Sequence, residues 1–260
     1  MNHTTIIYSV EERIASVTLN RPDRRNALDD VMIRELTETF QSLNRNDGCR
    51  VVVLSGAGDS FCAGMDLNYL QRFSEKDHEE NLEDARNLLK LLQLVCSLKK
   101  PVIAMVNGPA LGGGCGLAVA CDFVWASNEN AKLGTPEVRL GFVPAVILLF
   151  LIKRMGEGKA KEFVLRGEIL NAVRSKDAGL VTEVIEDSKL GESTYEFAKK
   201  LATSTSASSI ALTKELFSRF NEMSIQDILE YSANLNALAR KTDDFKKGIN
   251  SFLKKEKLQW

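Results

Sequence analysis

The chain has 260 residues, of which 44% are hydrophobic and 27% charged; this composition is typical of a globular protein with one large domain or two ordinary ones. Its 34 Lys and Arg nearly balance its 35 Asp and Glu, so the overall charge attracts neither nucleic acid nor an anionic membrane, and only a local basic site remains open. The five cysteines are odd in number and lack metal-ligand spacing, and no segment has the pattern of a signal peptide or a membrane span. We therefore expect a cytoplasmic protein with reduced thiols, no metal, no nucleic-acid partner and no membrane partner.

The first elements are a hairpin and a basic loop. Apolar residues on either side of a polar turn predict a β-hairpin over residues 4–19. A polar loop follows at 20–28 and contains Arg24 and Arg25. Such a loop can meet a phosphate, or its charges can simply be solvated.

A helix, a buried strand and a glycine-bearing turn come next. Asp29 is a good N-cap for an amphipathic helix that ends before Gly48. The apolar run 51–54 predicts a buried strand, which leads to a glycine-punctuated segment at 61–67. Residues 68–80 are polar and acidic, so we expect a mobile surface segment there.

The stretch 101–118 is the most informative part of the chain. An amphipathic helix over 82–95 leads into it, and its first residues predict a strand buried on both faces. A turn at 107–109 precedes a helix that begins among Gly112, Gly113 and Gly114. Glycines at a helix N-terminus let a ligand oxygen approach the unpaired N–H groups, although they can also serve only close packing.

The rest of the chain becomes increasingly helical. Residues 143–155 and 160–165 predict helices, and 167–185 predicts a loop, a short helix and a strand. Everything after Ser193 is helix-rich, with no linker before it. We therefore predict one α/β unit with a C-terminal helical region.

Five short segments, spread in order over nearly the whole chain, carry a resemblance in combination. They are Asn20-Arg21-Pro22 with Asn26-Ala27-Leu28, Phe61 through Leu67, Asn107-Gly108 through Cys121-Asp122, Pro136-Glu137 with Leu140-Gly141, and Thr242-Asp243-Asp244 with Ser251 through Lys255. Together they resemble the crotonase superfamily, the enoyl-CoA hydratase/isomerase family. The resemblance implies a spiral of ββα units over 1–195 and a helical trimerisation region over 196–260 within one continuous unit. It also implies homotrimers or dimers of trimers that act on an acyl-CoA thioester.

The resemblance also implies the roles of individual residues. The backbone N–H groups of Met65 and Gly113 would form an oxyanion hole around the thioester carbonyl, with coenzyme A as part of the substrate and no separate cofactor. Residues that would line the path of coenzyme A are Ala63, Met65, Asp66, Leu67, Asn68 and Gly113. Arg24, Arg25 and, from a neighbouring subunit, Lys255 are candidates for its phosphates.

One catalytic carboxylate of the family is present and one is absent. Family hydratases usually carry two glutamates, whose positions match Glu137 and Gly116 here. We expect Glu137 to act as general acid and base with a pKa raised by an apolar pocket. A second departure follows Pro144, where apolar residues replace the usual glycines, although the N–H of Ala145 can still hold a water.

These features favour hydration or dehydration of a 2-enoyl-CoA, and similarity to a bacterial methylglutaconyl-CoA hydratase-like subgroup suggests a branched acyl group. The missing glutamate favours the alternatives of a Δ3,Δ2-enoyl-CoA isomerase or an acyl-CoA decarboxylase that uses Glu137 alone. A hypothesis of another class is a non-catalytic scaffold that binds coenzyme A. The acyl chain, the direction of the reaction and the choice between trimer and hexamer stay open.

Overall fold

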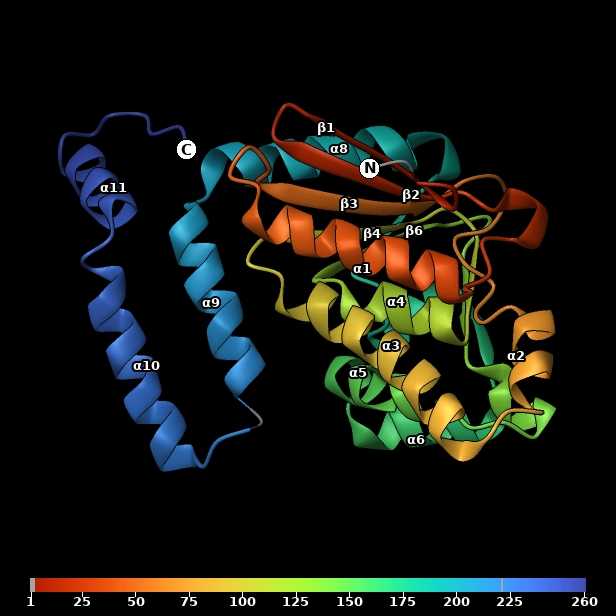
Figure 1. Cartoon of the computed structure of the whole chain (residues 1–260). Helices are drawn as coiled ribbons and strands as arrows, with labels where there is room; N and C mark the ends of the chain where they lie inside the picture. The colour runs from red at the N-terminus through yellow and green to blue at the C-terminus, as the bar shows by residue number, and fades with distance from the viewer. Residues whose placement is uncertain (1–2, 221) are drawn as a thin grey trace.

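The computed structural model describes residues 3–220 and 222–260, and a six-stranded sheet is its central element (Figure 1). The strand order is β1-β2-β3-β4-β6-β9, with one antiparallel pair, β1 with β2, and parallel pairing elsewhere. A second sheet has the order β5-β7-β8. The strands are β1 (Ile6–Glu11), β2 (Ile14–Leu19), β3 (Val51–Gly56), β4 (Val102–Val106), β5 (Pro109–Leu111), β6 (Phe123–Ser127), β7 (Lys132–Gly134), β8 (Ile169–Asn171) and β9 (Glu183–Ile185).

Helices cover both faces of the large sheet. Figure 1 shows α8 along one face and α1, α3 and α4 on the other. The helices are α1 (Asp30–Arg45), α2 (Leu67–Phe73), α3 (His78–Ser97), α4 (Gly113–Ala120), α5 (Ala145–Met155), α6 (Glu157–Arg166), α7 (Ala172–Ala178), α8 (Asp187–Ser204), α9 (Ala207–Arg219), α10 (Ile225–Ala239) and α11 (Asp243–Leu253), with 3-10 turns η1 (Pro22–Arg24) and η2 (Pro136–Leu140).

Strand β3 shows how the sequence produces this layering. Val51 and Val53 pack with Ala198 and Ala202 of α8, whereas Val52 and Leu54 belong to the larger core on the opposite face. Successive side chains of a strand point to opposite faces, so a strand that is apolar throughout must be covered on both. The buried strand predicted at this place, the hairpin before it and the Asp29 cap of α1 are therefore confirmed.

The region after the first glycine turn is helical where no helix was predicted. Residues 68–80, expected to be a mobile surface segment, are mostly exposed, but they contain helix α2 and the start of α3. Asp66 begins α2 by accepting hydrogen bonds from the N–H groups of Asn68 and Tyr69. Tyr69 is buried and its hydroxyl donates to Asp84 of α3. One buried aromatic side chain thus fixes a helix that its polar composition conceals.

The C-terminal helices α9, α10 and α11 extend away from the sheet (Figure 1), which confirms the α/β class with a helical C-terminal region. The expected division at 195/196 falls inside α8, whose later residues still pack on the sheet. The chain end returns towards α8, because Trp260 N–H donates to Thr203 O and Arg13 donates to Trp260 O. Within residues 3–220 and 222–260, no helix combines the length and apolar character needed to cross a bilayer.

A buried carboxylate ties the N-terminal strand to α1. Glu35 is 6% exposed and accepts hydrogen bonds from the backbone N–H and the hydroxyl of both Thr4 and Thr5, at 2.6–2.9 Å. Burial raises the pKa of Glu35, but the hydrogen bonds of Thr5 and Thr4 outweigh it and lower the pKa from 4.5 to about 2.

We expect Glu35→Gln to lower the free energy of unfolding by about 2 kcal/mol at pH 7. Because the folded pKa is depressed, this stabilisation is present above the ordinary carboxyl pKa and is lost as the pH falls through the folded value. Urea unfolding at pH 7 and pH 3 should show a smaller difference at pH 3. The control is Glu38→Gln on the same helix, where the side chain is exposed; an equal loss in both variants would contradict the assignment.

Candidate functional site

Two turns that follow neighbouring parallel strands meet at one edge of the sheet. The chain leaves β3 at Gly56 and β4 at Val106, which are the carboxyl ends of paired parallel strands. The two turns pair directly, since Cys62 bridges Ala110 and Leu111 N–H donates to Cys62 O at 2.9 Å. This is the edge at which α/β sheets usually bind ligands.

The N–H of Met65 points away from Leu28, the residue with which Met65 forms a parallel β-bridge. Leu28 N–H donates to Gly64 O at 2.7 Å, and Asp66 N–H donates to Leu28 O at 2.8 Å. Leu28 therefore uses the backbone groups on either side of Met65 in this parallel bridge. The N–H of Met65 itself is left on the opposite side of the segment.

The N–H of Gly113 lies beside this segment. Gly113 is the first residue of α4, and the first N–H groups of a helix have no intrahelical acceptor. A Cβ placed on Gly64 would lie 3.6 Å from Gly113 N, so the two chain segments are in close contact. The structure thus places the segment that carries Met65 beside Gly113, at the positive end of a helix.

Arg21 and Asn26 support this arrangement, and the sequence analysis assigned neither of them a role. Arg21 forms ion pairs with Asp29 at 3.0 Å and Asp66 at 3.2 Å, which are the N-caps of α1 and α2. Asn26 is fully buried, and its side-chain amide donates to the carbonyl oxygens of Ala57 and Ser60. Asn26 also has a φ of 55°, a left-handed conformation that Asn tolerates. In the sequence, only its place in the segment Asn26-Ala27-Leu28 pointed to it.

Glu137 lies against the start of α4. It is the second residue of η2, and its Oε1 is 3.0 Å from the place where a Cβ on Gly112 would be. Its Oε2 is buried and has no hydrogen-bond partner among the described residues. Burial raises the pKa of Glu137. The pKa of Cys115 is raised to about 12, mainly by burial of its own thiol and secondly by the negative charge of Glu137.

A carboxylate held in this way is easily protonated and has a free oxygen to exchange a proton. An unpaired buried oxygen costs stability, and such groups occur where function requires them. The structure therefore places Glu137, the predicted catalytic side chain, beside the start of α4, where Gly113 lies.

Gly116, the position without the expected second glutamate, is covered by Ile147. A Cβ on Gly116 would lie 2.2 Å from Cγ2 of Ile147 and 3.6 Å from Leu92. The chain differs from the family pattern at Gly116 and again after Pro144. These two places pack against each other, as a contact between α4 and α5.

The predicted contacts for coenzyme A divide into near and distant groups. Arg25 lies next to the site, since Ala63 N–H donates to Arg25 O at 2.9 Å. Leu67 and Asn68 are exposed at the start of α2, and Arg24 is exposed on η1. Lys255 follows α11, which lies on the opposite side of the molecule from α2 (Figure 1). One chain therefore does not bring Lys255 to the other predicted residues.

The carboxylate of Asp66 already has hydrogen-bond and ion-pair partners within the chain. Burial raises its pKa, but hydrogen bonds from the N–H groups of Tyr69 and Asn68, together with Arg21, outweigh burial and lower it. Its carboxylate is thus held as the cap of α2 and the partner of Arg21.

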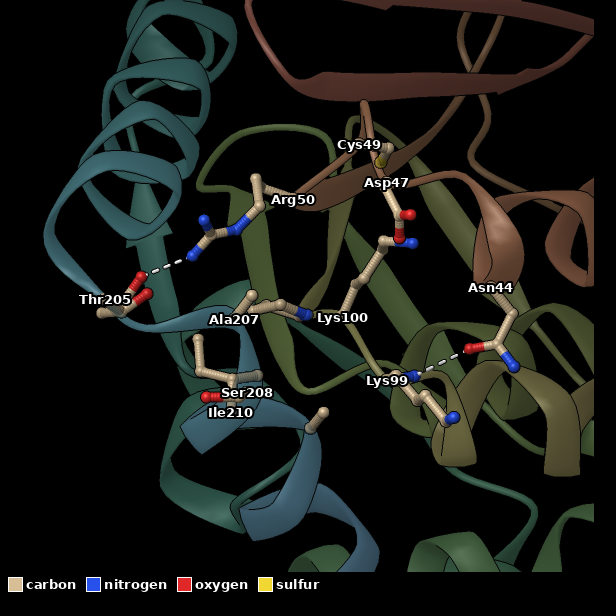
Figure 2. Close-up of a pocket in the computed structure, with 12 residues that line it drawn as sticks. Asn44, Asp47, Cys49, Arg50, Lys99, Lys100, Thr205, Ala207, Ser208 and Ile210 are labelled. Atoms are coloured by element: carbon tan, nitrogen blue, oxygen red, sulfur yellow. Dashed lines mark hydrogen bonds between the residues drawn. The ribbon is translucent and has the colours of Figure 1, made fainter. Parts of the chain in front are cut away.

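A cavity of about 240 Å³ lies elsewhere, at the amino ends of β3 and β4 (Figure 2). Arg50, Lys99 and Lys100 are among its lining residues, together with Thr205 and Ser208 from the start of α9. The Arg50 guanidinium donates to Thr205 O, and Lys99 N–H donates to Asn44. Its lining includes none of Met65, Gly113 and Glu137, so it is separate from the site at the carboxyl edge.

Comparison with known proteins gives one consistent result. A sequence model of the family described as Enoyl-CoA hydratase/isomerase matches residues 9–260. The chain is 36% identical over 251 residues to the 2,3-dehydroadipyl-CoA hydratase of Escherichia coli, covering 96% of each protein. It is 32% identical over 259 residues to the crotonyl-CoA hydratase of Syntrophomonas wolfei, covering 99% of this chain and 98% of the relative. The crystal structure of an enoyl-CoA hydratase from Bacillus anthracis superposes with a TM-score of 0.90 at 30% identity, covering 99% of both chains.

The matched range contains both glycine turns, Pro136-Glu137 and the C-terminal helices. The chain is an enzyme of the enoyl-CoA hydratase/isomerase family, the crotonase superfamily.

Proposed function

We propose that the protein hydrates a 2-enoyl-CoA, or dehydrates the corresponding 3-hydroxyacyl-CoA, through a thioester enolate with Glu137 as the only carboxylate that moves protons. The observation that carries the proposal is the unpaired, buried Oε2 of Glu137 next to the start of α4. Relatives of similar length named as hydratases of 2,3-dehydroadipyl-CoA and crotonyl-CoA support this type of reaction.

The thioester carbonyl oxygen would accept hydrogen bonds from the N–H groups of Met65 and Gly113. These donors stabilise the negative charge that develops on this oxygen when the enolate forms, by about 3 to 4 kcal/mol each. Residues 63–68 and Arg25 would then lie along the bound coenzyme A. No separate cofactor is proposed, because proton transfer and an oxyanion hole suffice for this chemistry.

A single carboxylate can complete the hydration. Glu137 accepts a proton from water as the water oxygen bonds to the β-carbon, and the electrons of the double bond move into the enolate. Protonated Glu137 then donates this proton to the α-carbon, and the carbonyl group re-forms. Ala145 is the first residue of α5, so its N–H is free of intrahelical bonds and can hold the water.

A Δ3,Δ2-isomerase is the second candidate, and Gly116 is the observation that favours it. Isomerisation needs one base to remove a proton from one carbon and return it to another, which Glu137 alone can do. A decarboxylase would use the same oxyanion hole and would need Glu137 only to protonate the enolate.

We also propose that α9, α10 and α11 mediate assembly into homotrimers or dimers of trimers. These helices expose large apolar side chains, among them Phe217, Ile225, Leu229 and Phe252, which are 60–82% exposed. Exposed apolar surface of this extent marks an interface. Lys255 would then reach the coenzyme A phosphates of a neighbouring subunit. The mass of the protein in solution, measured by light scattering, tests this assembly.

The test of the proposed reaction is the ultraviolet absorbance of the conjugated 2-enoyl thioester. We expect a fall in absorbance with formation of 3-hydroxyacyl-CoA from crotonyl-CoA or from a branched substrate such as methylglutaconyl-CoA. Turnover of 3-enoyl-CoA to 2-enoyl-CoA, with no hydration, would establish the isomerase instead. Binding of acyl-CoA without turnover on a panel that includes decarboxylase substrates would support the scaffold hypothesis.

A further inference from the structure

Glu137 and Ile147 lie against the two glycines that bound the first turn of α4. Gly112 is the N-cap of α4, and Gly116 N–H donates to Gly112 O at 3.0 Å, so the two glycines are one turn apart. Oε1 of Glu137 is 3.0 Å from the place of a Cβ on Gly112, and Cγ2 of Ile147 is 2.2 Å from the place of a Cβ on Gly116. The carboxylate and the isoleucine side chain therefore both pack on this first turn.

We propose that Ile147 determines which acyl groups the site accepts, because its side chain forms an apolar wall beside Glu137 in the space that Gly116 leaves open. This inference rests on the proposed function, since it concerns the acyl group on which Glu137 acts. Ile147 is a specificity-determining residue in this role and takes no part in proton transfer.

Gly116 and Ile147 pack so closely that a larger side chain at position 116 does not fit without movement. A Cβ at position 116 would also lie 2.9 Å from Cβ of Ile147, a distance that real Cβ atoms do not show, so α4 or α5 must move to admit one. Ile147 is 2% exposed, and Leu92, which would lie 3.6 Å from the same Cβ, is fully buried. Ile147 in its present position therefore requires glycine at position 116.

The wall has a consequence for the substrate. The α- and β-carbons of the acyl group must lie within reach of Glu137, so the next carbons of the chain lie near Ile147. A polar group in that place would lose its hydration against Ile147 and Leu92. The wall therefore accepts an alkyl segment and limits its size, and shortening Ile147 by three carbons should admit a longer one.

The first experiment measures kcat/KM of Ile147→Ala for crotonyl-CoA, 2-hexenoyl-CoA and 2-octenoyl-CoA. We expect the ratio of 2-hexenoyl-CoA to crotonyl-CoA to rise about tenfold relative to the parent. The matched control is Ile103→Ala, another buried isoleucine, on β4, which packs with Ala198 and Ala202 of α8. The control should leave the ratio unchanged, and an unchanged ratio in Ile147→Ala would overturn the inference.

The second experiment tests the packing without relying on activity. Gly116→Ala should lower Tm in the parent by several degrees but lower it much less in the Ile147→Ala background. Equal losses in both backgrounds would overturn the inference, because the two residues would then be independent. If Ile147→Ala does not fold, Ile147→Val replaces it in the first experiment, with a smaller change in the same direction expected. Valine keeps the Cγ2 that meets position 116, so in the second experiment Gly116→Ala should cost the same Tm in the Ile147→Val background as in the parent.

The outcomes separate this inference from the proposed function. A parent enzyme that turns over none of the 2-enoyl thioesters overturns the proposed function. In that case calorimetric binding of butyryl-CoA, hexanoyl-CoA and octanoyl-CoA to the parent and to Ile147→Ala takes the place of kinetics. A relative gain in affinity for the longer chains supports the inference, and identical profiles overturn it.

Discussion

Replacement of Glu137 by Gln should lower kcat for 2-enoyl-CoA hydration by about 10²- to 10⁴-fold with little change in the affinity for acyl-CoA. Gln keeps the shape of the side chain but cannot accept and return a proton. Among the described residues, Glu137 is the carboxylate that has a buried, unpaired oxygen, and it lies against the start of α4. Stopped-flow absorbance gives kcat, and calorimetry with butyryl-CoA gives the affinity.

The pH dependence should identify the same group. Burial raises the pKa of Glu137, and the carboxylate form must accept the proton of water, so kcat/KM of the parent should fall as the pH drops through this raised value. The Gln variant should lack that acid limb. Because a raised folded pKa means that the carboxylate destabilises the fold at neutral pH, Glu137→Gln should be at least as stable as the parent at pH 7.

A control separates this effect from a general loss of charge. Glu162 lies on α6, is 66% exposed and pairs with Arg166, so Glu162→Gln should leave kcat and its pH profile unchanged. A Glu137→Gln enzyme with more than half of the parent kcat would contradict the assignment of Glu137.

Replacement of Gly113 by Pro should lower kcat by about 10²- to 10³-fold, because proline removes the N–H that we assign to the oxyanion hole. The first position of a helix is the one where proline is well tolerated, and Gly113 is the first residue of α4. The residue before it, Gly112, has a ψ of −122°, which avoids the values near zero at which the proline ring would clash with the preceding residue. The fold should therefore survive the substitution.

The matched variant for this test is Gly113→Ala, which keeps the N–H. Its Cβ would lie 3.3 Å from the terminal Cδ1 of Leu28 and 3.8 Å from Leu88, so small side-chain shifts accommodate it. We expect it to retain activity within about tenfold of the parent. If the alanine and proline variants lose the same amount, the loss arises from packing and the N–H of Gly113 has no special role.

The sequence alone predicted those parts of the fold in which local pattern and tertiary environment agree. Asp29 caps α1 as expected, and the apolar run at β3 is buried on both faces. Helix α2 was missed because its polar residues show no periodicity, and its position depends on contacts of Tyr69 with a later helix. The three-residue strands β5 and β8 are too short to leave a pattern.

The parts of the candidate site that lie in recognisable sequence motifs were predictable. The glycine turns and Glu137 were identified from residues and resemblance, and the structure places them together. The partnership of Gly116 with Ile147 was not predictable, because it joins two helices that are distant in sequence. Arg21 was hidden among neighbouring arginines, and only the structure shows that it joins the caps of α1 and α2.

The measurement that tests enolate formation most directly is exchange of the α-protons of butyryl-CoA with deuterium from D₂O, followed by proton NMR. A saturated thioester cannot be hydrated, so exchange reports only on removal and return of a proton beside the carbonyl. We expect exchange with the parent protein and at least 100-fold slower exchange with Glu137→Gln and Gly113→Pro. No exchange by the parent when butyryl-CoA is shown to be bound, or equal exchange by the Glu137→Gln variant, would contradict the proposed site.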